Sequence, residues 1–145
     1  MKTNPFTPDE QQRIVNAIRQ AETTTSGEIR VHVEPHCSTP DPVQRAIDVF
    51  AQLGMHQTKQ QNGVLFYLAH VDRKFAIVGD KGIDAKVSGN FWESTKNLLR
   101  SYFSAGQYAE GLIRGIGQAG VQLQQYFPYD RATDTNELAD DISFD

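Results

Sequence analysis

Residues 62–82 decide the fold, because they hold NGVLFYLA at positions 62–69 and, after a short turn, DRKFAIVGDKG at positions 72–82. The first run has no polar alternation, which is typical of a strand covered on both faces. The turn at residues 71–73 is too short for anything but an antiparallel neighbour. We therefore predict a central strand at 64–69, an antiparallel strand at 74–78, and a core that includes Leu65, Phe66, Leu68, Ile77 and Trp92.

The residues before this hairpin predict a further strand and a helix. Residues 27–34 place Ile29, Val31 and Val33 on one face and polar side chains on the other, which predicts a half-buried strand. Residues 42–53 have helical spacing, with Asp41 before the helix and Gly54 after it. Since this helix connects the strands at 27–34 and 64–69, we expect the two strands to be parallel.

Further helices complete the predicted architecture. A capping box from Thr7 to Glu10 begins a helix that ends before residues 23–26. After the hairpin we expect a short helical piece at 83–87, a helix that begins near Ser88, and a last helix at 107–127. This order predicts an α/β three-layer sandwich, in which helices flank a small mixed sheet with a parallel crossover and an antiparallel hairpin. The last helix contains four glycines, which predict close approach to the sheet or a neighbouring helix: Gly111, Gly115, Gly117 and Gly120.

Composition predicts one domain and an acidic tail. The chain has 145 residues, of which 39% are apolar, and a net charge of −4. Residues 129–145 carry six acids and one base, so the preceding body is close to neutral. We divide the chain into a domain at 1–128 and an extended tail at 129–145, in which Leu138, Ile142 and Phe144 can dock on the body or on a partner. A neutral body disfavours nucleic-acid binding.

The remaining composition bears on location. Cys37 is the only cysteine, which excludes an intrachain disulfide and a metal site built from paired cysteines. The first residues lack the apolar run of a signal peptide, and no stretch has the apolar length of a membrane helix. We therefore expect a cytoplasmic protein without membrane insertion.

The strand directions predict a cluster of oxygen donors at one end of the sheet. The donors come from three segments of the chain: Glu28, Asn62, Asp80 and Asp84. Glycines at 27, 63, 79 and 82 would let backbone carbonyls approach a ligand. Carboxylate, amide and carbonyl oxygens are the ligands that Ca²⁺ and Mg²⁺ prefer. The alternative is that these are turn residues, with Gly for positive φ and Asp or Asn for local hydrogen bonds.

The opposite end of the sheet offers softer ligands. His36, Cys37 and His70 lie there, where ligands often bind in open α/β sheets. Their spacing matches no zinc pattern, so we do not expect a metal. We expect Asp72 and Arg73 to stabilise the turn and to pair with each other or with a neighbour.

Three motifs together indicate a family. SGEIRV at 26–31, the hairpin at 62–82 and GQYAEGL at 106–112 resemble the TPM-domain family, whose members include a thylakoid-lumen acid phosphatase and a photosystem repair factor. The resemblance implies a Rossmann-like TPM fold, and it favours the cation site because some relatives bind calcium. Relatives usually have an acidic residue where this chain has Gln61, and Lys81 adds positive charge, so we expect weak binding.

Two functions are compatible with this sequence. The first is a protein- or peptide-interaction module with an unidentified protein partner and a weak Ca²⁺ or Mg²⁺ site. The second is a metal-dependent acid phosphatase-like phosphohydrolase. No phosphatase nucleophile is recognisable, because Cys37 has Val43 rather than Arg six positions on, and the chain contains neither an Asp-x-Asp pair nor an Arg-His-Gly triplet. Phosphatase activity therefore rests on the resemblance alone, and interaction is the leading hypothesis.

Overall fold

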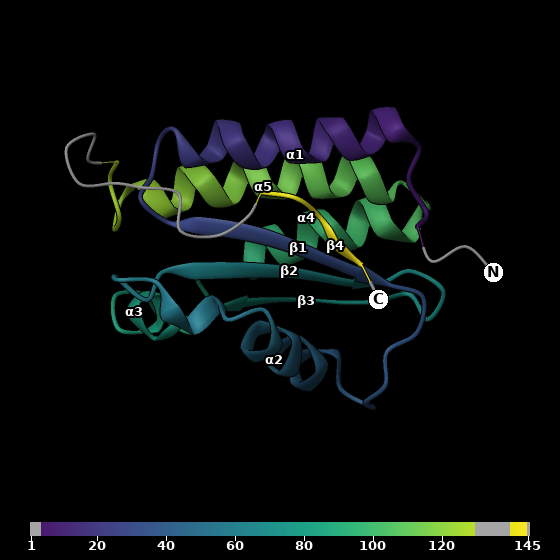
Figure 1. Ribbon diagram of the computed structural model, residues 1–145, viewed down its shortest axis with the longest axis horizontal. Coiled ribbons are helices and arrows are strands. Elements are labelled where there is room, and N and C mark those ends of the chain that lie inside the picture. Colours follow the sequence, from purple (N-terminus) through teal and green to yellow (C-terminus); the bar gives the residue numbers. More distant parts are fainter. Residues whose placement is uncertain (1–3, 130–139, 145) are drawn as a thin grey trace.

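The sheet of this protein lies between two layers of helices (Figure 1), in a computed structural model that describes residues 4–129 and 140–144. Within these residues the sheet has four strands in the order β3-β2-β1-β4. The strands are β1 (Glu28–Glu34), β2 (Gly63–Ala69), β3 (Lys74–Gly79) and β4 (Ser143–Phe144). Strand β2 is parallel to β1 and antiparallel to β3, which confirms the predicted crossover and hairpin. Strand β4, parallel to β1, is an addition that the sequence did not predict.

The helices form one thick layer and one thin layer. One face is covered by α1 (Pro8–Glu22), α4 (Glu93–Ser104) and α5 (Tyr108–Gln124), and the other by α2 (Pro42–Gln52) (Figure 1). The short elements η1 (Met55–Gln57) and α3 (Lys81–Asp84) lie at one end of the sheet. Helix α4 begins later than the predicted Ser88, because the backbone of residues 88–93 forms two turns, with hydrogen bonds from Phe91 to Ser88 and from Glu93 to Asn90. The predicted capping box of α1 is present.

The central strand is buried on both faces, as the sequence predicted. Phe66 and Leu68 contact the core formed with α1, α4 and α5, whereas Leu65 and Tyr67 contact the smaller core under α2. The five residues predicted to be in the core are each at most 9% exposed: Leu65, Phe66, Leu68, Ile77 and Trp92. The prediction of a central strand at 64–69 is therefore confirmed.

The prediction that the first strand is half-buried is wrong. The polar face of β1 is covered, because Glu28, His32 and Glu34 are each at most 4% exposed. Neighbouring side chains cover this face, because Glu34 contacts Arg45 of α2 and Tyr67 of β2, and the ring of His32 stacks on Tyr67 and is hydrogen-bonded to Ser143 of β4. Buried charged groups need partners, and those of Glu34 form the polar cluster described below.

Three of the four α5 glycines allow close helix contacts, as predicted. A Cβ atom would lie 2.8 Å from Phe103 at Gly111, 2.7 Å from Leu99 at Gly115, and 2.9 Å from Ala21 at Gly120. A Cβ at Gly117 would meet nothing within 4 Å, so close contact does not explain this glycine.

This difference predicts opposite effects of two alanine substitutions in α5. Gly117→Ala should raise the free energy of unfolding by about 0.5–1 kcal/mol, because it removes backbone freedom from the unfolded chain at an open position. Gly111→Ala should lower it by about 1–3 kcal/mol, because the new methyl group would overlap the ring of Phe103. Urea denaturation of both variants measures the difference. Equal changes in the same direction would show that helix packing does not distinguish the two sites.

The last described residues belong to the packed structure. Strand β4 places Ser143 beside His32 and Phe144 beside Val33 of β1. Ile142 and Phe144 are half-buried against the main core, while Leu138 lies outside the described residues. The extended tail therefore docks in part on the body, and the division at residue 128 stays a prediction.

No described helix has the length and apolar character needed to span a membrane.

Candidate functional site

The sheet register brings the predicted cation residues to one end of the sheet. Glu28 is paired with Gly63 across β1 and β2, and its N–H donates to the carbonyl of Asn62 at 3.2 Å. On the other side, the N–H of Asp80 donates to the carbonyl of Gly63 at 3.0 Å. Asp84 closes the group, since its N–H donates to the carbonyl of Asp80 at 3.1 Å. The four residues therefore lie on neighbouring segments.

The side chain of Asn62 has a local structural role. Its Nδ2 donates to the carbonyl of Ser26 at 3.1 Å, which ties the segment before β1 to the start of β2. Asn62 is 2% exposed, and Asp84 at the end of α3 is exposed. The turn role that the sequence left open is thus realised at Asn62.

Asp80 differs from the other residues of this group. Its Oδ1 accepts a hydrogen bond from the N–H of Lys81 at 2.7 Å, at the start of α3. Its Oδ2 is buried and has no hydrogen-bond partner among the described residues, and Asp80 as a whole is only 7% exposed. A buried oxygen without a partner costs free energy unless some other group satisfies it. Asp80 therefore fits a role as a cation ligand.

Backbone carbonyls lie beside Gly82, two residues after Asp80. A Cβ at Gly82 would lie 2.1 Å from the carbonyl oxygen of Gln60 and 2.6 Å from that of Gln61, so only glycine fits there. Gln61 has a φ of 50°, which is unfavourable for a residue with a side chain. Among residues 4–129 and 140–144, no group of three or more His, Cys, Asp or Glu side chains is arranged to hold a metal ion. A cation here would therefore depend on Asp80, carbonyl oxygens and water.

The opposite end of the sheet is held together by Asp72. Its Oδ1 accepts from Nδ1 of His36 at 2.9 Å, and its Oδ2 accepts from the N–H of Cys37 at 2.8 Å. Two hydrogen bonds lower the pKa of Asp72. The larger effect comes from His36 and the smaller from the N–H of Cys37. Asp72 thus pairs with neighbours and stabilises the turn, as predicted.

A polar cluster around Glu34 was missed by the sequence analysis. Glu34 accepts two hydrogen bonds from Arg45 of α2, through Nε at 2.9 Å and Nη2 at 2.8 Å. It also accepts from the hydroxyl of Tyr67 and lies 3.2 Å from Nε2 of His32. Burial alone would raise the pKa of Glu34, but these hydrogen bonds outweigh it and lower the pKa from 4.5 to about 2. The cluster joins β1, β2 and α2 through an ionised carboxylate.

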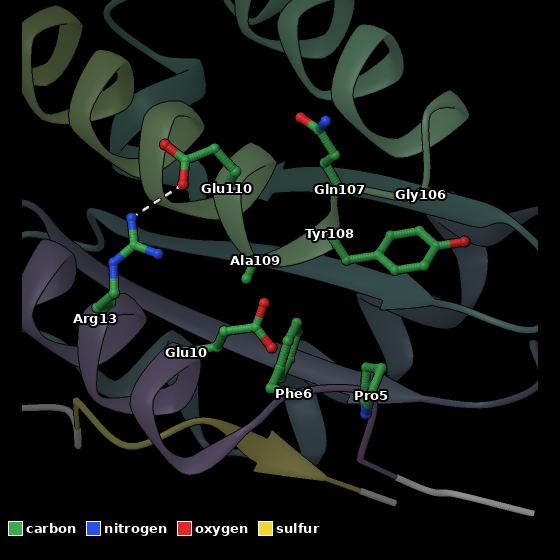
Figure 2. A pocket seen from close by; sticks show the side chains of 9 residues that line it. All are labelled: Pro5, Phe6, Glu10, Arg13, Gly106, Gln107, Tyr108, Ala109 and Glu110. Atoms are coloured by element: carbon green, nitrogen blue, oxygen red, sulfur yellow. Dashed lines mark hydrogen bonds and ion pairs between the residues drawn. The ribbon is translucent and has the colours of Figure 1, made fainter.

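A cavity of about 250 Å³ lies between the starts of α1 and α5 (Figure 2). Both carboxylates that line it already have partners, because Glu10 accepts from the N–H of Thr7 and Glu110 forms an ion pair with Arg13 at 3.0 Å. Arg13 lowers the pKa of Glu110, with a further contribution from Arg114. Since Glu110 connects α5 to α1, this part of the GQYAEGL motif has a packing role.

A pair of carboxyl groups holds the segment before β4. Glu22 at the end of α1 accepts from the N–H of Ile29 at 3.0 Å and is hydrogen-bonded to Asp140. The pKa of Glu22 is raised from 4.5 to about 9. Burial is the larger cause, and the hydrogen bond with Asp140 is the second. Glu22 is therefore protonated at neutral pH and donates to Asp140.

This pair predicts a pH dependence of stability. A raised pKa in the folded state means that folding loses stability as the pH rises from about 4.5 towards 9, because ionisation is easier in the unfolded chain. Glu22→Gln should remove this dependence, since an amide can keep both hydrogen bonds without a charge. Thermal melting should show the variant to be more stable than the wild type near pH 8, with little difference near pH 4. An unchanged pH profile would contradict a protonated Glu22.

The fold and the end of the sheet that holds Asp80 together define the class of protein. It is a small α/β sandwich domain with oxygen donors at the amino-terminal ends of its parallel strands. The chain belongs to the TPM-domain family, whose model matches residues 2–122. This confirms the family that the three sequence motifs indicated.

Solved structures support the same fold. The NMR structure of the BA42 protein from the psychrophilic bacterium Bizionia argentinensis is similar to this chain, with 47% identity and a TM-score of 0.90, over 97% of this chain and 95% of that chain. The N-terminal domain of a protein from P. gingivalis has 18% identity and a TM-score of 0.69, over 90% and 85% of the two chains. The N-terminal domain of the cg2496 protein from Corynebacterium glutamicum has 12% identity and a TM-score of 0.63, over 93% and 78%. None of the curated proteins matched this chain.

Proposed function

We propose that this TPM domain is a non-catalytic interaction module that binds a divalent cation weakly where Glu28, Asn62, Asp80 and Asp84 meet. The observation that carries the proposal is the buried Oδ2 of Asp80, for which the part of the chain that the structure describes supplies no hydrogen-bond partner. The carbonyls of Gln60 and Gln61 beside Gly82 supply further oxygens of the kind that hard cations prefer.

The charges around the site favour weak binding, and its geometry favours Ca²⁺ over Mg²⁺. Lys81 follows Asp80 directly, and Gln61 contributes no charge. Ca²⁺ accepts irregular sets of oxygen ligands, whereas Mg²⁺ requires a nearly regular octahedron. We expect a Kd of roughly 1 mM, at the weak end of protein calcium sites.

The interaction part of the proposal rests on charge. Residues 129–145 carry six acids and one base, beside a body that is close to neutral. Such a segment favours a partner with a basic surface, and bound cation at the sheet end would add positive charge to the body. The cytoplasmic location expected from the sequence stays a prediction.

A calcium titration followed by amide NMR tests the cation site. Addition of Ca²⁺ should shift the amide signals of Asn62, Gly63 and residues 79–84. Asp80→Asn should weaken binding about tenfold or more, because it removes the charge while its amide oxygen can still accept from the N–H of Lys81. Asp9→Asn, in an exposed position on the first turn of α1, is the matched control and should bind as the wild type does. Shifts confined to His36 and His70, or none at millimolar Ca²⁺, would contradict the proposal.

A phosphate-ester assay separates this function from metal-dependent phosphate hydrolysis. The purified protein should show no turnover of a generic phosphate ester with Mg²⁺, Ca²⁺ or a chelator, at acidic or neutral pH. Turnover that depends on added metal and disappears in Asp80→Ala would assign the same site to a phosphohydrolase instead.

A further inference from the structure

A second cavity, of about 190 Å³, lies at the opposite end of the sheet from Asp80. It lies beside the end of β2 and the start of β3, where α4 ends and α5 begins. Its lining combines apolar side chains with two arginines: Leu68, Phe75, Phe103, Tyr108, Ser104, Arg73 and Arg100. The carboxyl ends of parallel strands are the usual place for ligands in open α/β sheets.

The apolar part of this cavity is well fixed. The rings of Phe75 and Phe103 are nearly perpendicular, with centroids 5.2 Å apart, and the ring of Tyr108 lies 5.6 Å from that of Phe103. The hydroxyl of Tyr108 donates to the carbonyl of His70 at 3.2 Å. Leu68, which also lines the cavity, is 1% exposed. These side chains therefore form a preformed apolar floor.

The two arginines give the rim a positive charge. Nη1 of Arg100 donates to Oδ1 of Asn97 at 2.8 Å, and its guanidinium carbon lies 5.8 Å from the centre of the Phe75 ring. In the described part of the chain neither Arg73 nor Arg100 is paired with a carboxylate. Asp72, the acid next to Arg73, is bound to His36 and Cys37 instead. Among residues 4–129 and 140–144, no acidic residue lines the cavity, so the two arginines favour an anion there.

The backbone at Arg73 has a left-handed conformation. Its φ is 57°, in the left-handed region where Gly, Asn and Asp are more common. The turn between β2 and β3 accounts for this conformation, and glycine at this position would adopt it without strain.

We propose that this cavity binds a free carboxylic acid with one aromatic ring, with the ring on the apolar floor and the carboxylate between Arg73 and Arg100. The size fits, because a protein cavity of about 150 Å³ is enough for benzene. The charge fits as well, since the planar guanidinium group of arginine matches carboxylates in geometry and strength. Aromatic rings also prefer perpendicular and offset contacts such as those the floor provides.

An NMR titration with phenylacetate tests the proposal. Phenylacetate should bind with a Kd of roughly 1 mM and shift the signals of Leu68, Phe75 and Tyr108. Phenylacetamide, which lacks the charge, and acetate, which lacks the ring, should cause little shift at the same concentration. Equal binding of phenylacetamide, or no binding of phenylacetate at roughly 10 mM, would overturn the proposal. Tighter binding of a short peptide that ends in phenylalanine would overturn the assignment to a free acid.

Matched variants separate ligand binding from structural effects. Arg100→Gln and Arg73→Gly should each weaken phenylacetate binding about tenfold, while Arg73→Gly should not lower the melting temperature, since glycine relieves the strain at φ 57°. Arg114→Gln is the control, because the guanidinium of Arg114 lies 5.6 Å from the Tyr102 ring but does not line the cavity. Equal loss of binding in Arg114→Gln would show that the effect is one of general charge and would overturn the proposal.

Discussion

Glu34→Ala is expected to lower the free energy of unfolding by about 3–5 kcal/mol, the usual cost of removing one partner from a buried charge pair. The substitution would leave the Arg45 guanidinium and the Tyr67 hydroxyl without their acceptor, in positions where the side chain of Arg45 is 14% exposed and Tyr67 is 1% exposed. Urea denaturation near neutral pH measures the loss. A loss below about 1 kcal/mol would show that water replaces the carboxylate at little cost.

Two controls identify the charge as the cause. Glu34→Ala combined with Arg45→Met should lose less than the sum of the single variants, because the double variant leaves no unpaired cation. The wild type should also lose stability in acid. Because the pKa of Glu34 is lowered to about 2, its stabilisation is complete above about pH 4.5 and disappears as the pH falls from 4.5 towards 2, by roughly 3 kcal/mol. Glu34→Gln should lack this acid-dependent part.

Leu68→Ala is expected to cost about 2–5 kcal/mol, the range for truncation of a buried leucine. Leu68 is 1% exposed in the core formed with α1, α4 and α5, so its removal would leave a cavity there. Val71→Ala is the control, because Val71 is 46% exposed and should change stability by no more than about 0.5 kcal/mol. Thermal or urea unfolding of both variants measures the contrast. A loss below about 1 kcal/mol in Leu68→Ala would show that β2 is not central.

The sequence was sufficient for features that depend on local patterns. The apolar run at 64–69, the short turn after it and the capping box at Thr7 are local signals of a buried strand, an antiparallel hairpin and a helix start, and the structure has all three. Strand β4 could not be predicted in this way, because two residues carry no periodicity. Only the apolar side chains of Leu138, Ile142 and Phe144 indicated that the tail could dock, and Leu138 lies outside the described residues.

The candidate sites could also be predicted from the sequence only in part. Strand directions alone were enough to bring Glu28, Asn62 and Asp80 to one sheet end, because parallel and antiparallel pairing determine where strands begin. The alternation in residues 27–34 was read as a solvent-facing side, since charged residues are seldom buried unless paired. The pair of Glu34 and Arg45 forms only after α2 has packed on the sheet, so no spacing in the sequence shows it.

The position of β4 has a consequence for the order of folding. The hydrogen bond between His32 and Ser143 closes a loop of 111 residues, whereas the β2–β3 hairpin needs only a turn. Closing so long a loop costs more chain entropy, so β4 should join the sheet after the rest of the domain has formed. Until then this edge of β1 stays open to strands of other molecules. Aggregation during refolding should therefore begin at this edge.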